Sequence, residues 1–150
     1  MKKRIVMMLM LLLAVVSTTL ANNKDGINEY VNASFKKEFS MAQDVQWETG
    51  KDVYKATFRL NDQVLFAYFA INGELVAVTR NILSVQLPIR LLAAVKNEYS
   101  NHWITELFEV SSNSGTDYYI TLENADSTLI LKSANGSSWQ SYKKIRKEAD

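Results

Sequence analysis

The stretch VLFAYFAINGELVAV, from Val64 to Val78, decides the fold because it places two apolar runs around the dipeptide Asn72-Gly73. Both turn residues tolerate the positive φ of a type I′ turn, so the stretch predicts a β-hairpin. A hairpin on a core is usually apolar on one face and polar on the other. Here both faces of the first strand are apolar, with Val64, Phe66 and Tyr68 on one side and Leu65, Ala67 and Phe69 on the other. The second face must therefore be covered or serve in binding.

Period-two alternation continues on both sides of this hairpin, and a helix precedes it. Alternation and turn residues predict antiparallel strands near residues 43–49, 52–60, 64–71 and 74–82. Upstream, GINEYVNASFKKEFSMA carries apolar residues at spacings of three and four, namely Ile27, Val31, Phe35, Phe39 and Ala42. This spacing predicts an amphipathic helix with Asp25 as its N-cap.

The second half of the chain shows the same succession. Pro88, the only proline, is suited to the first position of a helix, where no backbone N–H is needed. The stripe that follows consists of Leu91, Leu92, Val95 and Tyr99. Four strands are predicted after it, near residues 103–111, 117–124, 128–134 and 137–144, with turns that include Asn124-Ala125-Asp126 and Asn135-Gly136.

Three segments of the first half recur in the second half in the same order. FKKEFS (35–40) is similar to VKNEYS (95–100), YKATFRLND (54–62) to YYITLENAD (118–126), and INGE (71–74) to ANGS (134–137). Such recurrence predicts a duplicated unit. We therefore expect an α+β fold of two tandem helix-plus-four-stranded antiparallel units, about 25–84 and 85–147. Their sheets should join edge to edge or pack as neighbours, with both helices on one face and the other face open and slightly concave.

The first 21 residues, MKKRIVMMLMLLLAVVSTTLA, have the three parts of a secretory signal: a basic start, a run of twelve apolar residues and small residues before a cut after Ala21. A membrane anchor is the alternative, but the run is shorter than the roughly 20 residues needed to span a bilayer. No cysteine follows the run, which excludes a lipid-anchored lipoprotein. We expect a soluble periplasmic or secreted protein made of residues 22–150, a size typical of one domain.

Composition narrows the classes of function. Removal of the signal leaves fourteen of the seventeen basic residues against sixteen acidic ones, a balance that argues against a nucleic-acid binder. The chain has no cysteine, so it has neither a disulfide nor a thiolate nucleophile. His102 is the only histidine, and we interpret it as a surface or capping residue because no G-x-S-x-G motif accompanies it. Glu106 and Glu109 should point to opposite faces of a strand. We expect no enzyme, no metal site and no cofactor.

The aromatic and basic residues near the strands can serve either in packing or in binding. Trp47 is in phase with Val45 and is predicted to lie in the core, whereas Trp103 and Trp139 could pack or bind a ligand. The basic residues of the tail are Lys143, Lys144, Arg146 and Lys147. They could contact anionic lipid or an acidic partner, but a solvated terminus or the protection of an edge strand explains them as well.

Three short patterns carry a resemblance to a known family. They are Gln46-Trp47 at the start of a strand, the strand positions Tyr54, Ala56, Phe58 and Leu60, and the hairpin positions Tyr68, Phe69, Asn72 and Gly73. With the duplicated plan, they make the chain resemble the PepSY-like family of small secreted bacterial proteins, which is itself likened to the β-lactamase inhibitory protein. The resemblance covers nearly all of residues 22–150. It implies a non-enzymatic binding or inhibitory role, and it supplies no inhibitory loop, since the matching residues are packing and turn residues. Such sequences tend to be charged at the outward positions of the third strand, where this chain has Val64, Phe66 and Tyr68.

The leading functional hypothesis follows from the open face of the sheet. The residues predicted to bind a partner are Lys55, Arg59, Val64, Phe66, Tyr68 and Tyr119. Aromatic residues beside Arg and Lys are typical of protein interfaces, so we expect another envelope or extracellular protein as partner, with inhibition of an envelope hydrolase as one form of this role. A binder of a small ligand or envelope polymer is the second hypothesis, and a structural homodimer is the third.

Overall fold

The structure is a computed structural model that describes residues 26–134 and 136–147. The predicted signal peptide, the predicted N-cap Asp25 and the turn residue Asn135 lie outside the described residues. In the described part of the chain, no helix is both long enough and apolar enough to span a membrane.

The predicted elements are present, with ends displaced by a few residues. The first half contains α2 (Glu29–Glu38), β1 (Gln43–Thr49), β2 (Val53–Leu60), β3 (Gln63–Ala70) and β4 (Leu75–Asn81). The second half contains η1 (Ser84–Gln86), α3 (Ile89–Glu98), β5 (Trp103–Ser112), β6 (Gly115–Glu123), β7 (Ser127–Ser133) and β8 (Gln140–Arg146). The N-cap of α2 is Asn28, whose side-chain oxygen accepts a hydrogen bond from the Tyr30 amide at 2.9 Å.

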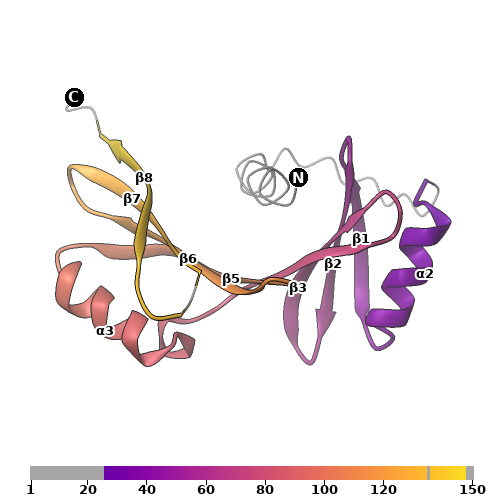
Figure 1. Cartoon of the computed structure of the whole chain (residues 1–150), viewed down its shortest axis with the longest axis horizontal. Helices are drawn as coiled ribbons and strands as arrows, with labels where there is room; N and C mark the ends of the chain where they lie inside the picture. Colours follow the sequence, from indigo (N-terminus) through magenta and orange to yellow (C-terminus); the bar gives the residue numbers. More distant parts are fainter. Residues whose placement is uncertain (1–25, 135, 148–150) are drawn as a thin grey trace.

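All eight strands form one antiparallel sheet in the order of the chain, from β1 to β8 (Figure 1). The α+β class is thereby confirmed, and the description of the fold as two tandem units stays a prediction. Of the two arrangements left open by the sequence, the edge-to-edge one is observed. The join is the β4–β5 pair, in which Arg80 lies opposite Glu109.

Both helices lie on the same face of the sheet. Val78 of β4 packs against the apolar cluster beneath α2, and Ile82, which directly follows β4 and still bonds to Leu107 of β5, belongs to the cluster beneath α3. Because alternate residues of a strand share a face, these two clusters are on one side. Figure 1 shows α2 and α3 at opposite ends of a bent sheet, and the side away from α3 is concave. We call this side the concave face.

The cluster beneath α2 is aromatic. Phe58 is 1% exposed, and its ring lies 5.1 Å from Phe35 and 4.7 Å from Phe39, measured between ring centroids. Trp47 contacts Phe35 at 5.1 Å, edge to face, so its predicted place in the core is confirmed. Leu65, Ala67 and Phe69 belong to the same cluster, which confirms the register predicted for the first strand of the hairpin.

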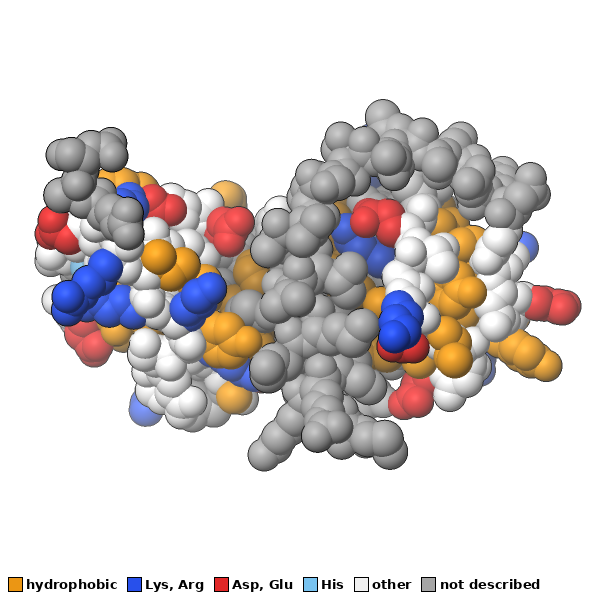
Figure 2. Space-filling view, turned by 90° about the horizontal axis from the view of Figure 1, so that it is seen from above, with side chains coloured by type: hydrophobic (Ala, Val, Ile, Leu, Met, Phe, Trp, Pro, Cys, Tyr) orange, Lys and Arg blue, Asp and Glu red, His pale blue; other side chains and the backbone are white. Residues whose placement is uncertain are grey.

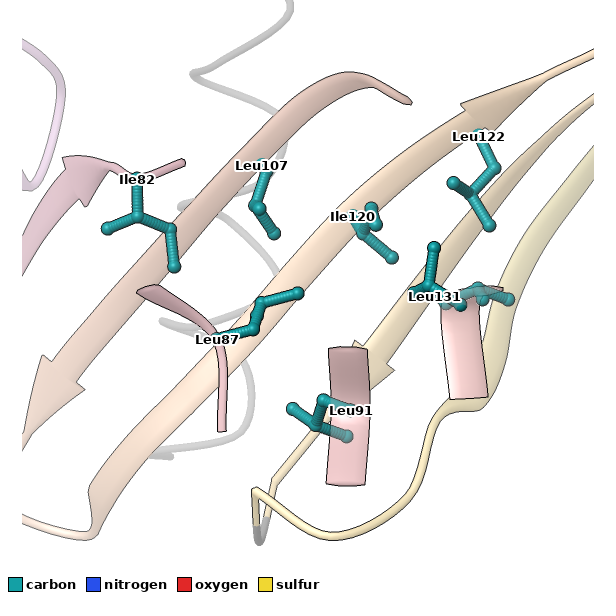
Figure 3. Packing of buried hydrophobic residues seen from close by; sticks show 8 residues of the cluster. Ile82, Leu87, Leu91, Leu107, Ile120, Leu122 and Leu131 are labelled. Carbon is teal, nitrogen blue, oxygen red and sulfur yellow. The ribbon is translucent and has the colours of Figure 1, made fainter. Parts of the chain in front are cut away.

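The cluster beneath α3 is aliphatic (Figure 3). Leu91 from the helix meets Leu107, Ile120 and Leu131 from three strands of the sheet. Trp139 packs against this cluster and donates from its indole nitrogen to the Leu91 carbonyl at 3.0 Å. Of the two undecided tryptophans, Trp139 is therefore a packing residue, whereas Trp103 is 53% exposed.

The hairpin turns depart from the sequence prediction. Asn61 and Asp62 both have positive φ, of 50° and 61°, and they form a two-residue type I′ loop between β2 and β3. At Asn72-Gly73 only Gly73 has positive φ, so the predicted type I′ turn there is wrong. The Gly73 amide bonds to the Ala70 carbonyl and the Ala70 amide to the Glu74 carbonyl, which gives a longer loop. A Cβ at position 73 would lie 2.8 Å from the Tyr30 carbonyl oxygen, so glycine is required.

Candidate functional site on the concave face

The concave face is the predicted binding side of the hairpin, and the pairing of strands fixes which residues it carries. Phe66 lies opposite Thr57, Tyr68 opposite Lys55 and Val64 opposite Arg59. These residues alternate with the ones that pack beneath α2, so their assignment to the face away from the helices is confirmed. Figure 2 views the molecule from this side and shows hydrophobic side chains beside Lys and Arg side chains.

The middle of this face holds a third apolar cluster, which we call the central cluster. Its buried members are Val53, Tyr68, Ala77, Val110 and Tyr119, and its partly buried members are Phe66, Val76 and Phe108. The Phe108 and Tyr119 rings are stacked at 5.2 Å. The cluster spans β2 to β6, so it joins residues from both halves of the chain.

Two of the predicted binding residues are buried in the central cluster. Tyr68 is 0% exposed and Tyr119 is 2% exposed, so the prediction that they lie open to solvent is wrong. The physical reason is the curvature of the sheet, because side chains on the inside of a bend are brought together and cover one another. Val64 is 49% exposed and Phe66 is half-buried, which leaves these two available to a partner.

The buried hydroxyl of Tyr68 is not satisfied by the described residues. Its oxygen is inaccessible and has no hydrogen bond of good geometry among them, although Thr79 lies beside it. Burial raises the pKa of Tyr68 from 10.0 to about 12, and the neighbouring Thr79 hydroxyl offsets part of this rise. Tyr68 therefore stays neutral in ordinary buffers and acts as a packing residue.

Three lysine residues of this face each lie over an aromatic ring and pair with a carboxylate. Lys55 lies 5.2 Å from the centre of the Phe66 ring and 2.8 Å from Glu48. In the same way, Lys132 lies over Tyr119 and pairs with Asp117, and Lys147 lies over Trp103 and pairs with Glu123. At these three positions the face thus combines an aromatic ring with a lysine whose charge is compensated by a neighbouring carboxylate.

The remaining predicted residue, Arg59, lies toward the β1 edge. Its Nε is 3.5 Å from Asp44, and both side chains are largely exposed. The structure therefore brings Lys55, Phe66, Tyr68 and Tyr119 to the middle of the face and leaves Arg59 and Val64 at its flank. Phe108, Lys132 and Tyr142 were missed by sequence reasoning. The Tyr142 ring contacts Tyr119 edge to face at 6.2 Å and is 44% exposed.

A groove of about 580 Å³ opens beside the central cluster where β4 ends. Phe66 and Phe108 line it from the two halves of the chain, and Ile82 and Leu107 come from the cluster beneath α3. Its outer residues include Leu83, which is 69% exposed, and Ile104, which is 38% exposed. Glu106 is the one charged residue among the described residues that line it.

The residues considered for catalysis are held by ordinary contacts. The His102 Nε2 lies 3.1 Å from the Asn124 amide nitrogen, and the imidazole ring packs edge to face on Tyr99. Glu106 accepts a hydrogen bond from Thr121 on the concave face, whereas Glu109 pairs with Arg80 on the helix side. The prediction that these two carboxylates point to opposite faces is confirmed. Within residues 26–134 and 136–147, no group of three or more His, Asp or Glu side chains could hold a metal ion.

The basic tail forms the last strand of the sheet. Lys143, Lys144 and Arg146 lie on β8, which is an edge strand and is exposed along its whole length. Their positions agree with the interpretation that charge protects an edge from pairing with other chains.

Solved structures with the same fold come from Bacteroides species. A BLIP-like protein from Bacteroides fragilis is 17% identical, with a TM-score of 0.70, over 89% of this chain and 94% of that chain. A DUF2874 family protein from Bacteroides ovatus is 20% identical, with a TM-score of 0.71, over 81% and 89% of the two chains. A protein from Bacteroides eggerthii that is described as a putative periplasmic protein is 16% identical, with a TM-score of 0.67, over 79% of this chain and 87% of that chain.

These likenesses establish a BLIP-like fold. No family model matches the chain, and no curated protein matches it. The resemblance to PepSY-like proteins therefore stays a prediction.

Proposed function

We propose that the protein is a periplasmic or secreted, non-enzymatic module that binds another envelope or extracellular protein through the concave face. Both helices cover the opposite side, so this face is the one large sheet surface in the described chain without a helix over it. The likeness in fold to a BLIP-like protein favours inhibition of an envelope hydrolase as the form of this role.

The partly buried aromatic residues of the central cluster, Phe66 and Phe108, together with the flanking lysines, are the observation that carries this proposal. Aromatic residues packed at the centre of a surface and surrounded by polar residues are the usual composition of an interface hot spot. Ion pairs with carboxylates compensate the charges of Lys55, Lys132 and Lys147. Such compensation disfavours an anionic polymer as a ligand of these three lysines, because binding a polyanion requires unpaired cations.

We also propose that the chain arose from two copies of one helix-plus-four-strand unit. The buried helix residues Val31 and Phe35 of α2 have counterparts at Leu91 and Val95 of α3, each sixty positions later. Each helix precedes four strands in the chain order. A duplicated unit explains why the concave face runs across both halves.

A double substitution at exposed positions tests the binding face. Val64→Glu with Tyr142→Glu should leave the melting temperature within a few degrees, because surface changes usually alter stability little. It should reduce capture of envelope proteins by immobilised residues 22–150 at least tenfold, since two apolar contacts become charged. Quantitative mass spectrometry of the captured proteins measures the effect.

The matched control is Ile89→Glu, which changes an apolar residue of α3 that is 77% exposed. It should retain every protein that the unchanged module captures. Equal loss of capture from both variants would contradict a role for the concave face. A change of the purified module from dimer to monomer in the double variant, without loss of a captured protein, would favour the homodimer hypothesis.

A small-ligand binder is the second candidate, and the groove beside the central cluster favours it. Its volume of about 580 Å³ lies within the range of small-molecule sites, and it is lined mainly by apolar residues. Saturable binding of a small envelope metabolite at Phe66 and Phe108, observed by NMR without any protein partner, would establish this alternative.

Export gives a prediction that is independent of the partner. The signal predicted from the sequence should be removed after Ala21, so the mature protein should begin at Asn22 and be recovered outside the cytoplasm in soluble form. N-terminal sequencing of the processed protein measures this directly. A protein that starts at Met1 and stays with the membrane fraction would contradict it.

A further inference from the structure

We propose that a groove between α2 and the free edge of β1 accepts an extended segment of a partner protein, which adds as a strand beside β1 and places a carboxylate on Lys36. We call this groove the edge groove. It lies on the helix side of the sheet, so it is separate from the concave face and does not depend on the proposed function. Its three features are an unpaired strand edge, an apolar cavity beside that edge and an unpaired cation in the cavity wall.

β1 is an edge strand whose outer backbone groups bond to no other described strand. It is first in the sheet order, beside α2 (Figure 1), and pairs only with β2. At the turn into β2, the Gly50 amide bonds to the Val53 carbonyl. Because residues of an antiparallel pair alternate between bonded and non-bonded, Glu48 bonds to β2, whereas the amides and carbonyls of Trp47 and Thr49 point away from it. These outward groups are a template for an added strand.

The edge groove opens between this strand edge and α2, with a volume of about 500 Å³. Apolar side chains line it from the residues that flank α2 and from β1, and they include Ile27, Phe39, Ala42, Val45 and Trp47. All five are only partly buried, so each keeps apolar surface available in the groove. Since Val45 and Trp47 share a face of β1, every second side chain of an added strand would point to the same face and enter the groove.

Lys36 supplies the charge of the edge groove. It is the one charged side chain among the described residues that line the groove. None of the ion pairs among the described residues includes it. Glu48, the nearby carboxylate on β1, pairs with Lys55 of the concave face instead. An unpaired lysine beside an apolar cavity therefore favours a segment with a carboxylate among its apolar side chains.

A second copy of the chain supplies no suitable strand for this edge. The carboxylates of β1 already pair with Arg59 and Lys55. The other edge strand, β8, contains no acidic residue, and its basic residues would repel Lys36. We therefore assign the edge groove to a different protein, with an exposed segment that alternates apolar and polar residues and has one Glu or Asp on its apolar face.

The test uses a blocked seven-residue peptide, Thr-Val-Thr-Glu-Thr-Val-Thr, with residues 22–150 of the protein. Titration followed by NMR should give a Kd at or below about 1 mM, with a shift of the Trp47 indole signal and slowed exchange of the Trp47 and Thr49 amides. A peptide with Lys in place of Glu should bind at least about fivefold more weakly. Two further Glu peptides are N-methylated at the odd or at the even amides. One should bind and the other should not, because only one set of amides faces β1.

Substitutions at the edge groove make the test specific. Lys36→Glu should reverse the preference between the Glu and Lys peptides. Lys37→Glu is the matched control and should leave the preference unaltered, because Lys37 is exposed on the same helix and is not among the described residues that line the groove. Thr49→Pro removes one outward N–H that β2 does not use, so it should weaken binding about fivefold or more. Thr49→Val keeps this N–H and should bind the peptide as the unchanged protein does.

Several outcomes would overturn the proposal. They are failure of the Glu peptide to bind, and equal binding by both N-methylated peptides, which would indicate anchoring by side chains alone. The Val64→Glu, Tyr142→Glu variant should bind the peptide normally, and loss of binding there would place the peptide on the concave face. Conversion of a dimer to a monomer by Thr49→Pro would show that the edge pairs with a second copy. If the peptide fails while the double variant still loses its captured protein, the edge groove is wrong and the proposed function stands.

Discussion

Phe58→Ala should lower the free energy of unfolding by roughly 3 to 5 kcal/mol, a large share of the 5 to 15 kcal/mol typical of a domain. Phe58 is 1% exposed and contacts both Phe35 and Phe39. Its removal leaves a cavity between β2 and α2 that the surrounding aromatic rings cannot fill. Denaturant unfolding followed by circular dichroism measures the change.

Thr57→Ala is the control for this prediction because it alters the neighbouring position on the other face. Thr57 is half-buried opposite Phe66 and belongs to none of the apolar clusters. We expect a loss of less than about 1 kcal/mol, as for most changes outside a core. Equal losses at the two positions would mean that the faces of β2 are assigned wrongly.

Alkaline pH should destabilise the protein through Tyr68. Its pKa is about 12 in the folded state against 10.0 for an exposed tyrosine, so the folded protein holds the proton more tightly than the unfolded chain. The associated stability is complete below pH 10 and is lost as the pH rises from 10 to about 12. Two pKa units correspond to roughly 2 to 3 kcal/mol.

Tyr68→Phe removes this pH dependence while it retains the ring. At pH 7 the variant should be as stable as the unchanged protein or more stable, because a buried hydroxyl without a good partner is lost. Tyr142→Phe, at an exposed position, should keep the full alkaline loss. Urea unfolding at pH 8, 10 and 11.5 compares the three proteins, and parallel curves for Tyr68→Phe and the unchanged protein would contradict the assignment.

The spacing of apolar residues along the sequence was sufficient to predict the helices and strands of the fold. Alternation placed β1 at residues 43–49, as observed, and the register that puts Ala67 and Phe69 with Phe58 is correct. The turn types were less predictable, because Asn61-Asp62 and Asn72-Gly73 are both compatible with a type I′ turn by composition. The contact of Gly73 with the Tyr30 carbonyl, which is distant in sequence, accompanies the longer loop.

The candidate site was predictable only in part. Period two assigns Phe66 and Tyr68 to a face, but it does not reveal that the sheet bends there and buries Tyr68. Phe108 and Tyr142 were missed because their approach to Tyr119 depends on the register of β5 against β6 and on the pairing of β8. The groove was missed because it depends on where β4 stops pairing, which periodicity does not determine.

The chain-order arrangement of the strands has a consequence for the rate of folding. Within the described chain, every neighbouring pair of strands except β4 and β5 is joined by a short hairpin loop. Hairpins close on the microsecond scale, and low contact order speeds folding. The β4–β5 pair must instead close a loop that contains η1 and α3, with a larger entropy cost. We therefore expect each half to form before the join, and we expect the pairing of β4 with β5, which brings Arg80 opposite Glu109, to be the slowest step.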